Sequence, residues 1–126
     1  MSNQQVKNYI EEAVVEEVYA GITTVPGATT DVLKVASGTI GAGYDGVIVS
    51  IAINQQNNVF VWVKKQEKQV YDNGLNSAAL PASLGECPLF VGILEKEKWE
   101  LGLTNPPAGD KVMAWLIRIR LFRKGV

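Results

Sequence analysis

Residues 111–122 read KVMAWLIRIRLF, and the alternation within this stretch decides the fold class. Every second residue from position 113 to 121 is large and apolar, whereas Arg118 and Arg120 occupy intervening positions. Successive side chains of a β-strand point to opposite faces. The stretch therefore predicts a strand that covers a core with one face and meets water or a partner with the other. The residues assigned to the core face are Met113, Trp115, Ile117, Ile119 and Leu121.

The segments before this stretch continue the strand pattern. Residues 99–103 (WELGL) alternate in the same way, and residues 105–110 (NPPAGD) form a turn before position 111. Strands are also expected in residues 31–37, 47–53, 59–65, 68–71 and 88–94. The runs 47–53 and 59–65 read as a hairpin with a loop of about five residues. Seven or eight strands at spacings of roughly 8–12 residues favour an antiparallel β-sandwich or barrel.

The N-terminal region is the one place where a helix is expected. Over residues 5–19, apolar side chains recur at three- and four-residue spacings and glutamates lie on the opposite face. Gly21 and the Pro26-Gly27 pair would end this helix. The expected organisation is thus an N-terminal helix or arm over residues 1–22 and a β-sandwich domain over residues 23–126. The apolar set is Val6, Tyr9, Ile10, Ala13, Val14 and Val18.

Composition places the chain among ordinary globular domains. It has 126 residues, of which 47% are hydrophobic and 20% charged, with a formal net charge of −1. That balance argues against general nucleic-acid binding. The N-terminus lacks the apolar segment of a signal peptide, and no apolar run approaches the roughly 20 residues that span a bilayer. The expectation is a soluble protein made in the cytoplasm, with neither a membrane nor nucleic acid as partner.

The sequence offers little catalytic chemistry. It contains no histidine, which removes Ser-His-Asp and Cys-His systems, and Cys87 is its single cysteine. We interpret Cys87 as a small buried hydrophobe and expect no cofactor, no metal site and no enzymatic activity. Aspartates near strand ends are read as turn residues, although an enzyme with paired carboxylates remains an alternative if two acids converge in a pocket. These aspartates are Asp31, Asp45, Asp72 and Asp110.

Several expected strands carry apolar side chains on both faces, as in residues 47–53 and 59–65. One face can fill the sandwich, and the other must be covered by the N-terminal helix, a long loop or a neighbouring subunit. Self-association is the interpretation we favour. Residues 1–20 carry a net charge of −3 and residues 111–126 carry +5, which suits contacts between neighbours. The expected contact residues are Arg118, Arg120 and Arg123, with Glu11, Glu12, Glu16 and Glu17 as their complements.

The order of strands and loops resembles the small single jelly-roll proteins of virus particles. The resemblance rests on an early strand after Val25-Pro26-Gly27, the strand from Gly46 to Ile53, and the Val70-Tyr71-Asp72 segment. A long loop reaching Cys87-Pro88-Leu89, the Trp99-Glu100-Leu101 strand and a long final strand complete it. It covers about three quarters of the chain as a pattern of order, without invariant residues. The same layout occurs in tumour-necrosis-factor-like trimers and in some lectins.

This resemblance implies an antiparallel jelly-roll-like sandwich of about eight strands and a structural role in a virion. The protein would be a capsid, penton or decoration (cement) subunit of a bacterial or archaeal virus. It would self-associate, as a trimer or pentamer, and dock on other capsid proteins. The N-terminal helix departs from the simplest jelly roll and would be an arm that grips a neighbour.

A carbohydrate- or receptor-binding module is the alternative function. Aromatic faces stack on sugars, and Trp62 and Tyr71 are the candidate platforms. The loops over residues 38–43 and 72–88 would complete such a site. Trp99 and Trp115 share the core-facing phase of their strands, so we assign both to core packing.

Overall fold

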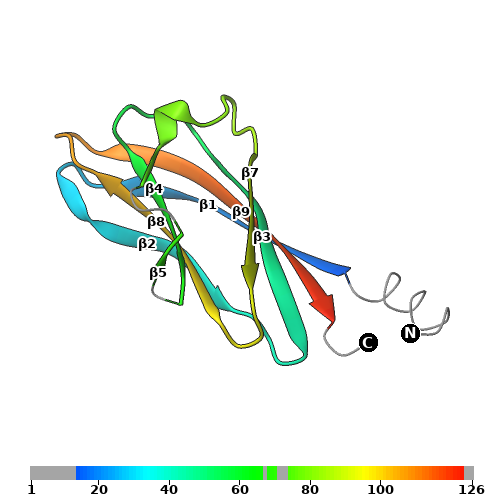
Figure 1. Ribbon diagram of the computed structural model, residues 1–126. Coiled ribbons are helices and arrows are strands. Elements are labelled where there is room, and N and C mark those ends of the chain that lie inside the picture. Colours follow the sequence, from blue (N-terminus) through cyan, green and yellow to red (C-terminus); the bar gives the residue numbers. More distant parts are fainter. Residues whose placement is uncertain (1–13, 67, 71–73, 124–126) are drawn as a thin grey trace, which may run out of the picture.

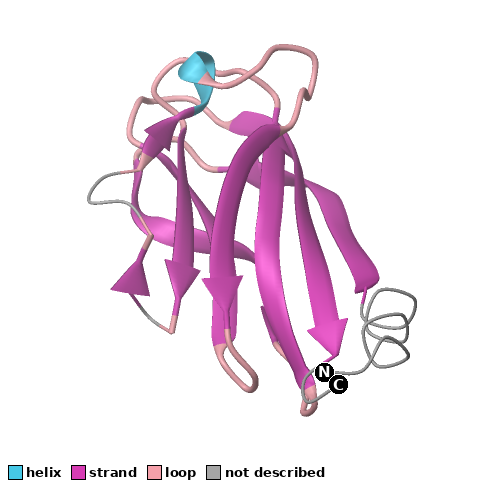
Figure 2. Cartoon of the chain, turned by 45° about the vertical axis from the view of Figure 1, so that its right-hand side comes forward, coloured by secondary structure: helices cyan, strands magenta, loops and turns pink. Residues whose placement is uncertain are grey.

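Two antiparallel β-sheets packed face to face form this protein in the computed structural model, which describes residues 14–66, 68–70 and 74–123 (Figure 1). The strands are β1 (Val14–Val25), β2 (Thr29–Thr39), β3 (Tyr44–Ile53), β4 (Phe60–Lys65), β5 (Lys68–Gln69), β6 (Leu75–Asn76), β7 (Cys87–Ile93), β8 (Lys98–Asn105) and β9 (Lys111–Arg123). A 3₁₀ turn, η1 (Ser77–Ala79), lies in the connection between the sheets at one end of the sandwich (Figure 2). The sequence-based expectation of a mainly β, antiparallel sandwich is confirmed.

The strands pair in a nested order. The first sheet runs β1-β9-β3-β7, and the second runs β2-β8-β4-β5 with β6 also beside β4. Thus β1 pairs with the last strand, β2 with β8, β3 with β7, and β4 with β5, all antiparallel. Residues far apart in sequence are neighbours as a result, and β9 lies between β1 and β3.

The expected hairpin between residues 47–53 and 59–65 is wrong, because β3 and β4 belong to different sheets. Asn54 holds the end of β3 to β9: its N–H donates to the Ala114 carbonyl at 3.2 Å and its Oδ1 accepts from the Ala114 N–H at 2.6 Å. Val59 already belongs to the other layer, where its carbonyl accepts from the Ser77 N–H at 2.8 Å. Residues 54–58 therefore cross from one sheet to the other. Because residues 47–53 and 59–65 are apolar on both faces, their sequence pattern does not show that the two strands lie in different sheets.

The expected N-terminal helix is also wrong wherever the structure describes it. Residues 14–19 belong to β1, which pairs with β9 without a register shift from Val14↔Phe122 to Val25↔Lys111. Val14, Val15 and Val18 fit a helical spacing, but β-branched side chains favour strands, and a long ladder with β9 outweighs local preference. Residues 5–13 of the expected helix lie outside the described residues. The boundary expected between residues 22 and 23 falls inside β1.

Apolar side chains from both sheets fill the interior. On β9, Met113, Ile117 and Ile119 are at most 1% exposed, which confirms their assignment to the core. Trp99 of β8 is also buried, and its ring lies 5.1 Å from that of Tyr19 on β1, between centroids. Trp115 is half-buried against the core, and its Nε1 donates to Thr23 Oγ1 at 3.0 Å.

Asn105, at the end of β8, joins two turns at one end of the sandwich. Its fully buried side-chain amide donates to the carbonyls of Val25 at 3.1 Å, Pro26 at 3.3 Å and Gly109 at 2.9 Å. The two turns touch directly here, since a Cβ on Gly27 would lie 2.3 Å from the backbone nitrogen of Gly109. Asn105 therefore fixes how β1 turns into β2 relative to the turn between β8 and β9.

We expect Asn105→Ala to lower the free energy of unfolding by about 2 kcal/mol, because buried carbonyls would lose their donor. Denaturant unfolding of both proteins measures this difference. Asn57→Ala, at an exposed asparagine in the β3–β4 connection, is the control and should change stability by less than about 0.5 kcal/mol. Equal effects of the two substitutions would contradict the role given to Asn105.

Candidate functional site

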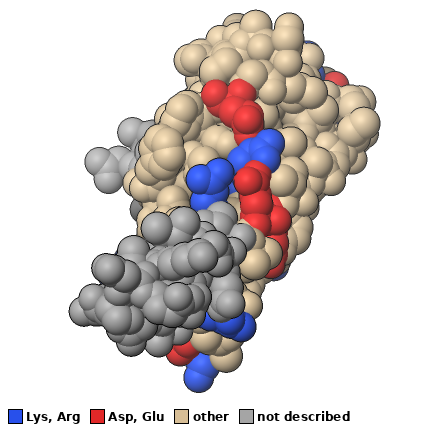
Figure 3. All heavy atoms as spheres, turned by 90° about the vertical axis from the view of Figure 1, so that its right-hand side faces the viewer, with Lys and Arg blue, Asp and Glu red and all other residues tan. Residues whose placement is uncertain are grey.

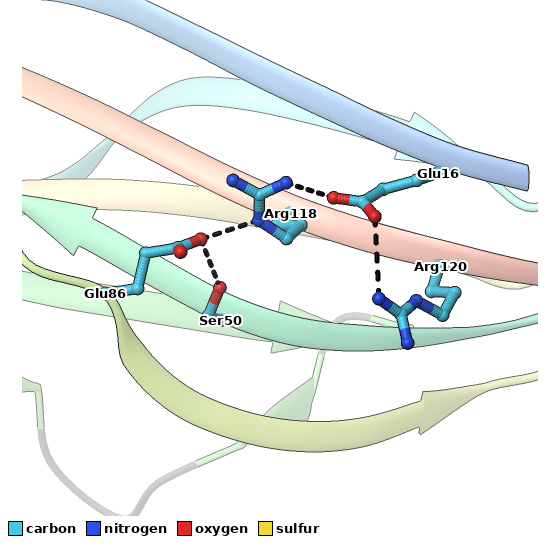
Figure 4. A network of polar contacts seen from close by, with 5 residues as sticks. All are labelled: Glu16, Ser50, Glu86, Arg118 and Arg120. Atoms are coloured by element: carbon cyan, nitrogen blue, oxygen red, sulfur yellow. Dashed lines mark hydrogen bonds and ion pairs between the residues drawn. The ribbon is translucent and has the colours of Figure 1, made fainter.

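The candidate site is the outer face of the β1-β9-β3-β7 sheet, where four ionisable side chains form one network (Figure 4). Arg118 of β9 lies at its centre. Its Nε donates to Glu86 Oε1 at 2.6 Å, and its Nη1 is ion-paired with Glu16 of β1. Arg120 Nη2 lies 3.5 Å from the other oxygen of Glu16, and Ser50 Oγ donates to Glu86 at 2.8 Å. The network thus joins β1, β9, β3 and the connection that precedes β7.

Strand register explains why these side chains meet. Glu16 lies directly opposite Arg120 in the β1–β9 pair, and Ser50 lies opposite Arg118 in the β3–β9 pair. Opposed residues of antiparallel strands share a face, with Cβ atoms about 4.5–5.5 Å apart. Glu86 reaches the same face from the connection before β7. Figure 3 shows the acidic and basic groups as a band across this side of the molecule.

Mutual pairing shifts the pKa values of these groups. The hydrogen bond from Arg118 lowers the pKa of Glu16 below its ordinary value of 4.5. The pKa of Glu86 is lowered chiefly by the hydrogen bond from Arg118 and to a smaller extent by the one from Ser50. The pKa of Arg118 is raised by its hydrogen bonds to the two carboxylates, and Glu86 has the larger effect. Elsewhere on β1, the hydrogen bond that Tyr19 donates to Glu17 raises the pKa of Tyr19 to about 12. Glu16, Glu86 and Arg118 therefore stay charged at neutral pH.

An apolar area continues the outer face beyond the charges. A shallow hollow there is lined by residues of β1, β3, β9 and the connection before β7: Ala20, Gly21, Ile22, Ala52, Leu84, Ala114, Trp115 and Leu116. Ile22 is 74% exposed, and Val18 and Leu84 are close to half exposed. By contrast, Ala52 is buried beneath this face. Part of the apolar surplus expected from the sequence is thus covered by the chain's own connection, and part stays open.

The structure brings together three of the predicted contact residues, Glu16, Arg118 and Arg120, and pairs them within one chain. Arg123 is the last residue of β9 and exposed, whereas Glu12 and Glu11 lie outside the described residues. Glu17 lies on the opposite side of β1 from Glu16, in register with buried Ile119. Sequence reasoning missed Glu86, since nothing in residues 72–88 marks which residue folds back onto β9.

Trp62, the first residue proposed for ligand stacking, is separated from this network and lies on the outer face of the second sheet. Trp62 of β4 is half-buried, and its Nε1 donates to Thr104 Oγ1 at 2.9 Å. It lines a shallow hollow together with Thr30, Phe60, Gly74, Thr104 and Pro106. Tyr71, the second proposed platform, lies outside the described residues.

Other residues singled out in the sequence have structural roles. Asp45 Oδ1 accepts a hydrogen bond from the Glu95 N–H at 3.0 Å, and Asp110 Oδ1 accepts one from the Gly27 N–H at 3.0 Å. Both accept from backbone N–H groups 50 and 83 residues away in sequence, which is a longer reach than the local bonds typical of turn aspartates. Asp31 is exposed on β2, and Asp72 lies outside the described residues. Cys87 is half-buried on β7 and packs against the core.

Comparison with known proteins assigns no family: no protein-family model matches the chain, and no curated protein matches its sequence. Within residues 14–66, 68–70 and 74–123, no group of three or more His, Cys, Asp or Glu side chains is placed to hold a metal ion. The same part of the chain has no helix long and apolar enough to cross a membrane.

We expect the double variant Glu16→Gln with Glu86→Gln to flatten the pH dependence of stability in acid. Both carboxylates have folded-state pKa values below 4.5, so their contribution is present above pH 4.5 and is lost as pH falls through the lowered values. Denaturant unfolding at pH 7 and pH 3 measures the change in each protein. The wild type should lose more stability between these conditions than the variant. An equal loss would contradict the network's contribution.

Proposed function

We propose that this protein is a structural subunit of a virus particle, built on a jelly roll, and that it acts by contacts with other copies and with neighbouring capsid subunits. The nested pairing of β1 with β9, β2 with β8, β3 with β7 and β4 with β5 supports the jelly roll, since rolling up one long hairpin produces this order. Fold alone does not define a function, so the proposal depends on the surface.

The observation that carries the proposal is the outer face of the β1-β9-β3-β7 sheet. It combines exposed apolar side chains, Ile22, Val18 and Leu84, with a band of charges paired within the chain. Apolar side chains beside a polar rim are typical of protein–protein contact surfaces. The arginines, being paired within the chain, would orient the surface, and the apolar area would supply the buried contact.

The most direct test is the composition of virus particles from cells that carry this gene. Particles are purified by density gradient, treated with protease and salt, and quantified by mass spectrometry. The proposal predicts the chain in many copies per particle. Its absence from intact particles, together with its presence in the soluble fraction, would overturn the proposal.

Substitution of the surface tests which face makes the contact. Leu84→Asp places a charge in the apolar area, and the residue's φ of 57° suits Asp better than Leu, so the fold should be kept. We expect about tenfold less of this variant on particles when it is added back to particles stripped of the chain, since burying the charge would be costly. Leu94→Asp, at a residue 58% exposed in the β7–β8 connection, is the matched control and should bind like the wild type. Equal binding by both variants would exclude the Leu84 face.

Carbohydrate binding is the second candidate function, supported by the hollow beside Phe60 and Trp62. Thr30 also lines the hollow and its hydroxyl suits a sugar, whereas Thr104 is buried and its Oγ1 already accepts from the Trp62 indole N–H. This candidate predicts hits on a glycan array that Trp62→Ala abolishes. An array without hits would remove it and leave the structural role unaffected.

A further inference from the structure

The edge strands of the sandwich differ in how well they are protected against pairing with another strand. Natural edges are blunted by charged side chains, above all lysine, and by prolines, bulges or short length. Strand β7 contains Pro88 and a register shift against β3, and β5 and β6 have two residues each. Strand β2 carries Asp31 and Lys34, and two irregularities interrupt its pairing with β8.

Strand β1 is the least protected of these edges, since its charged residues are limited to Glu16 and Glu17 near its N-terminal end. It runs for 12 residues, contains neither proline nor lysine, and keeps an unbroken register with β9. Among the described residues, β9 alone pairs with β1, so alternate residues of β1 direct their N–H and C=O groups away from the sheet. Four of the exposed large hydrophobic residues also lie on β1: Val15, Val18, Tyr19 and Ile22.

Unpaired backbone groups along a straight edge fit another β-strand as partner. The partner strand must itself have a long free edge, and β1 is the one such edge that the described part of the chain provides. A second copy of β1, related by a two-fold axis, therefore fits best. Closed symmetric dimers of this kind place the same patch on both subunits.

The side chains of β1 suit one antiparallel register in particular. For the outer faces of both copies to lie on the same side, outward residues must oppose outward residues. Centring the axis on Ala20 places Val18 opposite Ile22 of the second copy. Glu16 then faces Thr24, Glu17 faces Thr23, and Tyr19 faces Gly21, so no glutamate faces another. Centring the axis on Tyr19 would place Glu16 opposite Ile22.

We infer that two copies of this protein join edge to edge through β1, with Ala20 at the two-fold axis, and form one continuous sheet β7-β3-β9-β1-β1-β9-β3-β7. The inference rests on the self-association in the proposed function and specifies which strand makes the contact and in which register. It replaces the trimer or pentamer expected from the sequence with a dimer as the basic unit. The joined sheet also merges the two outer apolar areas into one surface.

The test uses sedimentation equilibrium of the full chain. Ala20→Lys places two lysines directly opposite each other at the axis. We expect this like-charge pair to raise the dissociation constant of the dimer about fivefold or more. Thr24→Lys is the matched control on the same face, where the new lysine meets Glu16 of the second copy, so the dimer should be kept or tightened. Both positions are exposed, so both variants should fold, as circular dichroism would show.

Cross-linking tests the register. With a short bis-maleimide reagent, Ala20→Cys should give covalent dimers, because the two residues face each other. Thr24→Cys and the wild type, which also keep Cys87, should not, since the two Thr24 residues would lie about 26 Å apart.

The outcomes separate the inference from the proposed function. A trimer or pentamer, a dimer equally stable in both lysine variants, or cross-linking through Thr24→Cys alone would overturn the β1 edge and leave a self-associating subunit. A wild type that stays monomeric at all concentrations would overturn the edge and the proposed self-association together.

Discussion

The alternation of side chains along β9 is the constraint on which the rest of the structure depends. Strand β9 pairs with β1 on one side and β3 on the other, so its register positions both neighbours. Ile117 and Ile119 point into the core, and Arg118 and Arg120 point out. A slip of one residue would bury the arginines and expose the isoleucines, so the hydrophobic core and the outer charges select the same register.

The same alternation shapes the outer surface. Arg118 connects Glu16 of β1 to Glu86 of the connection before β7, and so links the edge of the sheet to a segment more than thirty residues upstream of Arg118 in sequence. Because these charges are paired within the chain, Arg118 and Arg120 position the neighbouring side chains of this surface rather than bind a partner directly. Within the described residues, the exposed apolar side chains and the edge of β1 that faces away from β9 are available for contact, and both belong to the same sheet.

Much of the fold could be predicted from the sequence. Alternation and β-branched runs located β2, β3, β4, β7, β8 and β9 to within a few residues. The segment at Val14–Tyr19 was wrongly assigned to a helix, because its apolar spacing is helical, whereas pairing with β9, far along the chain, makes it a strand. Which sheet each strand joins was also hidden, since β3 and β4 are apolar on both faces.

About half of the candidate site could be predicted from the sequence. Alternation alone placed Arg118 and Arg120 on an outward face, and the charge imbalance pointed to glutamates near the N-terminus as partners. The register that puts Glu16 opposite Arg120, and the return of Glu86 onto β9, depend on tertiary structure. A long connection rich in small residues carries no pattern that would reveal such a contact.

Hydrogen exchange of backbone amides at low and high protein concentration tests the central claim most directly. If this protein acts through the β1-β9-β3-β7 sheet, amides of β1 that point away from β9 should exchange more slowly as concentration rises, while exchange along the β2 edge stays constant. Exchange in β1 that does not depend on concentration, or slowing confined to β2, would contradict the account.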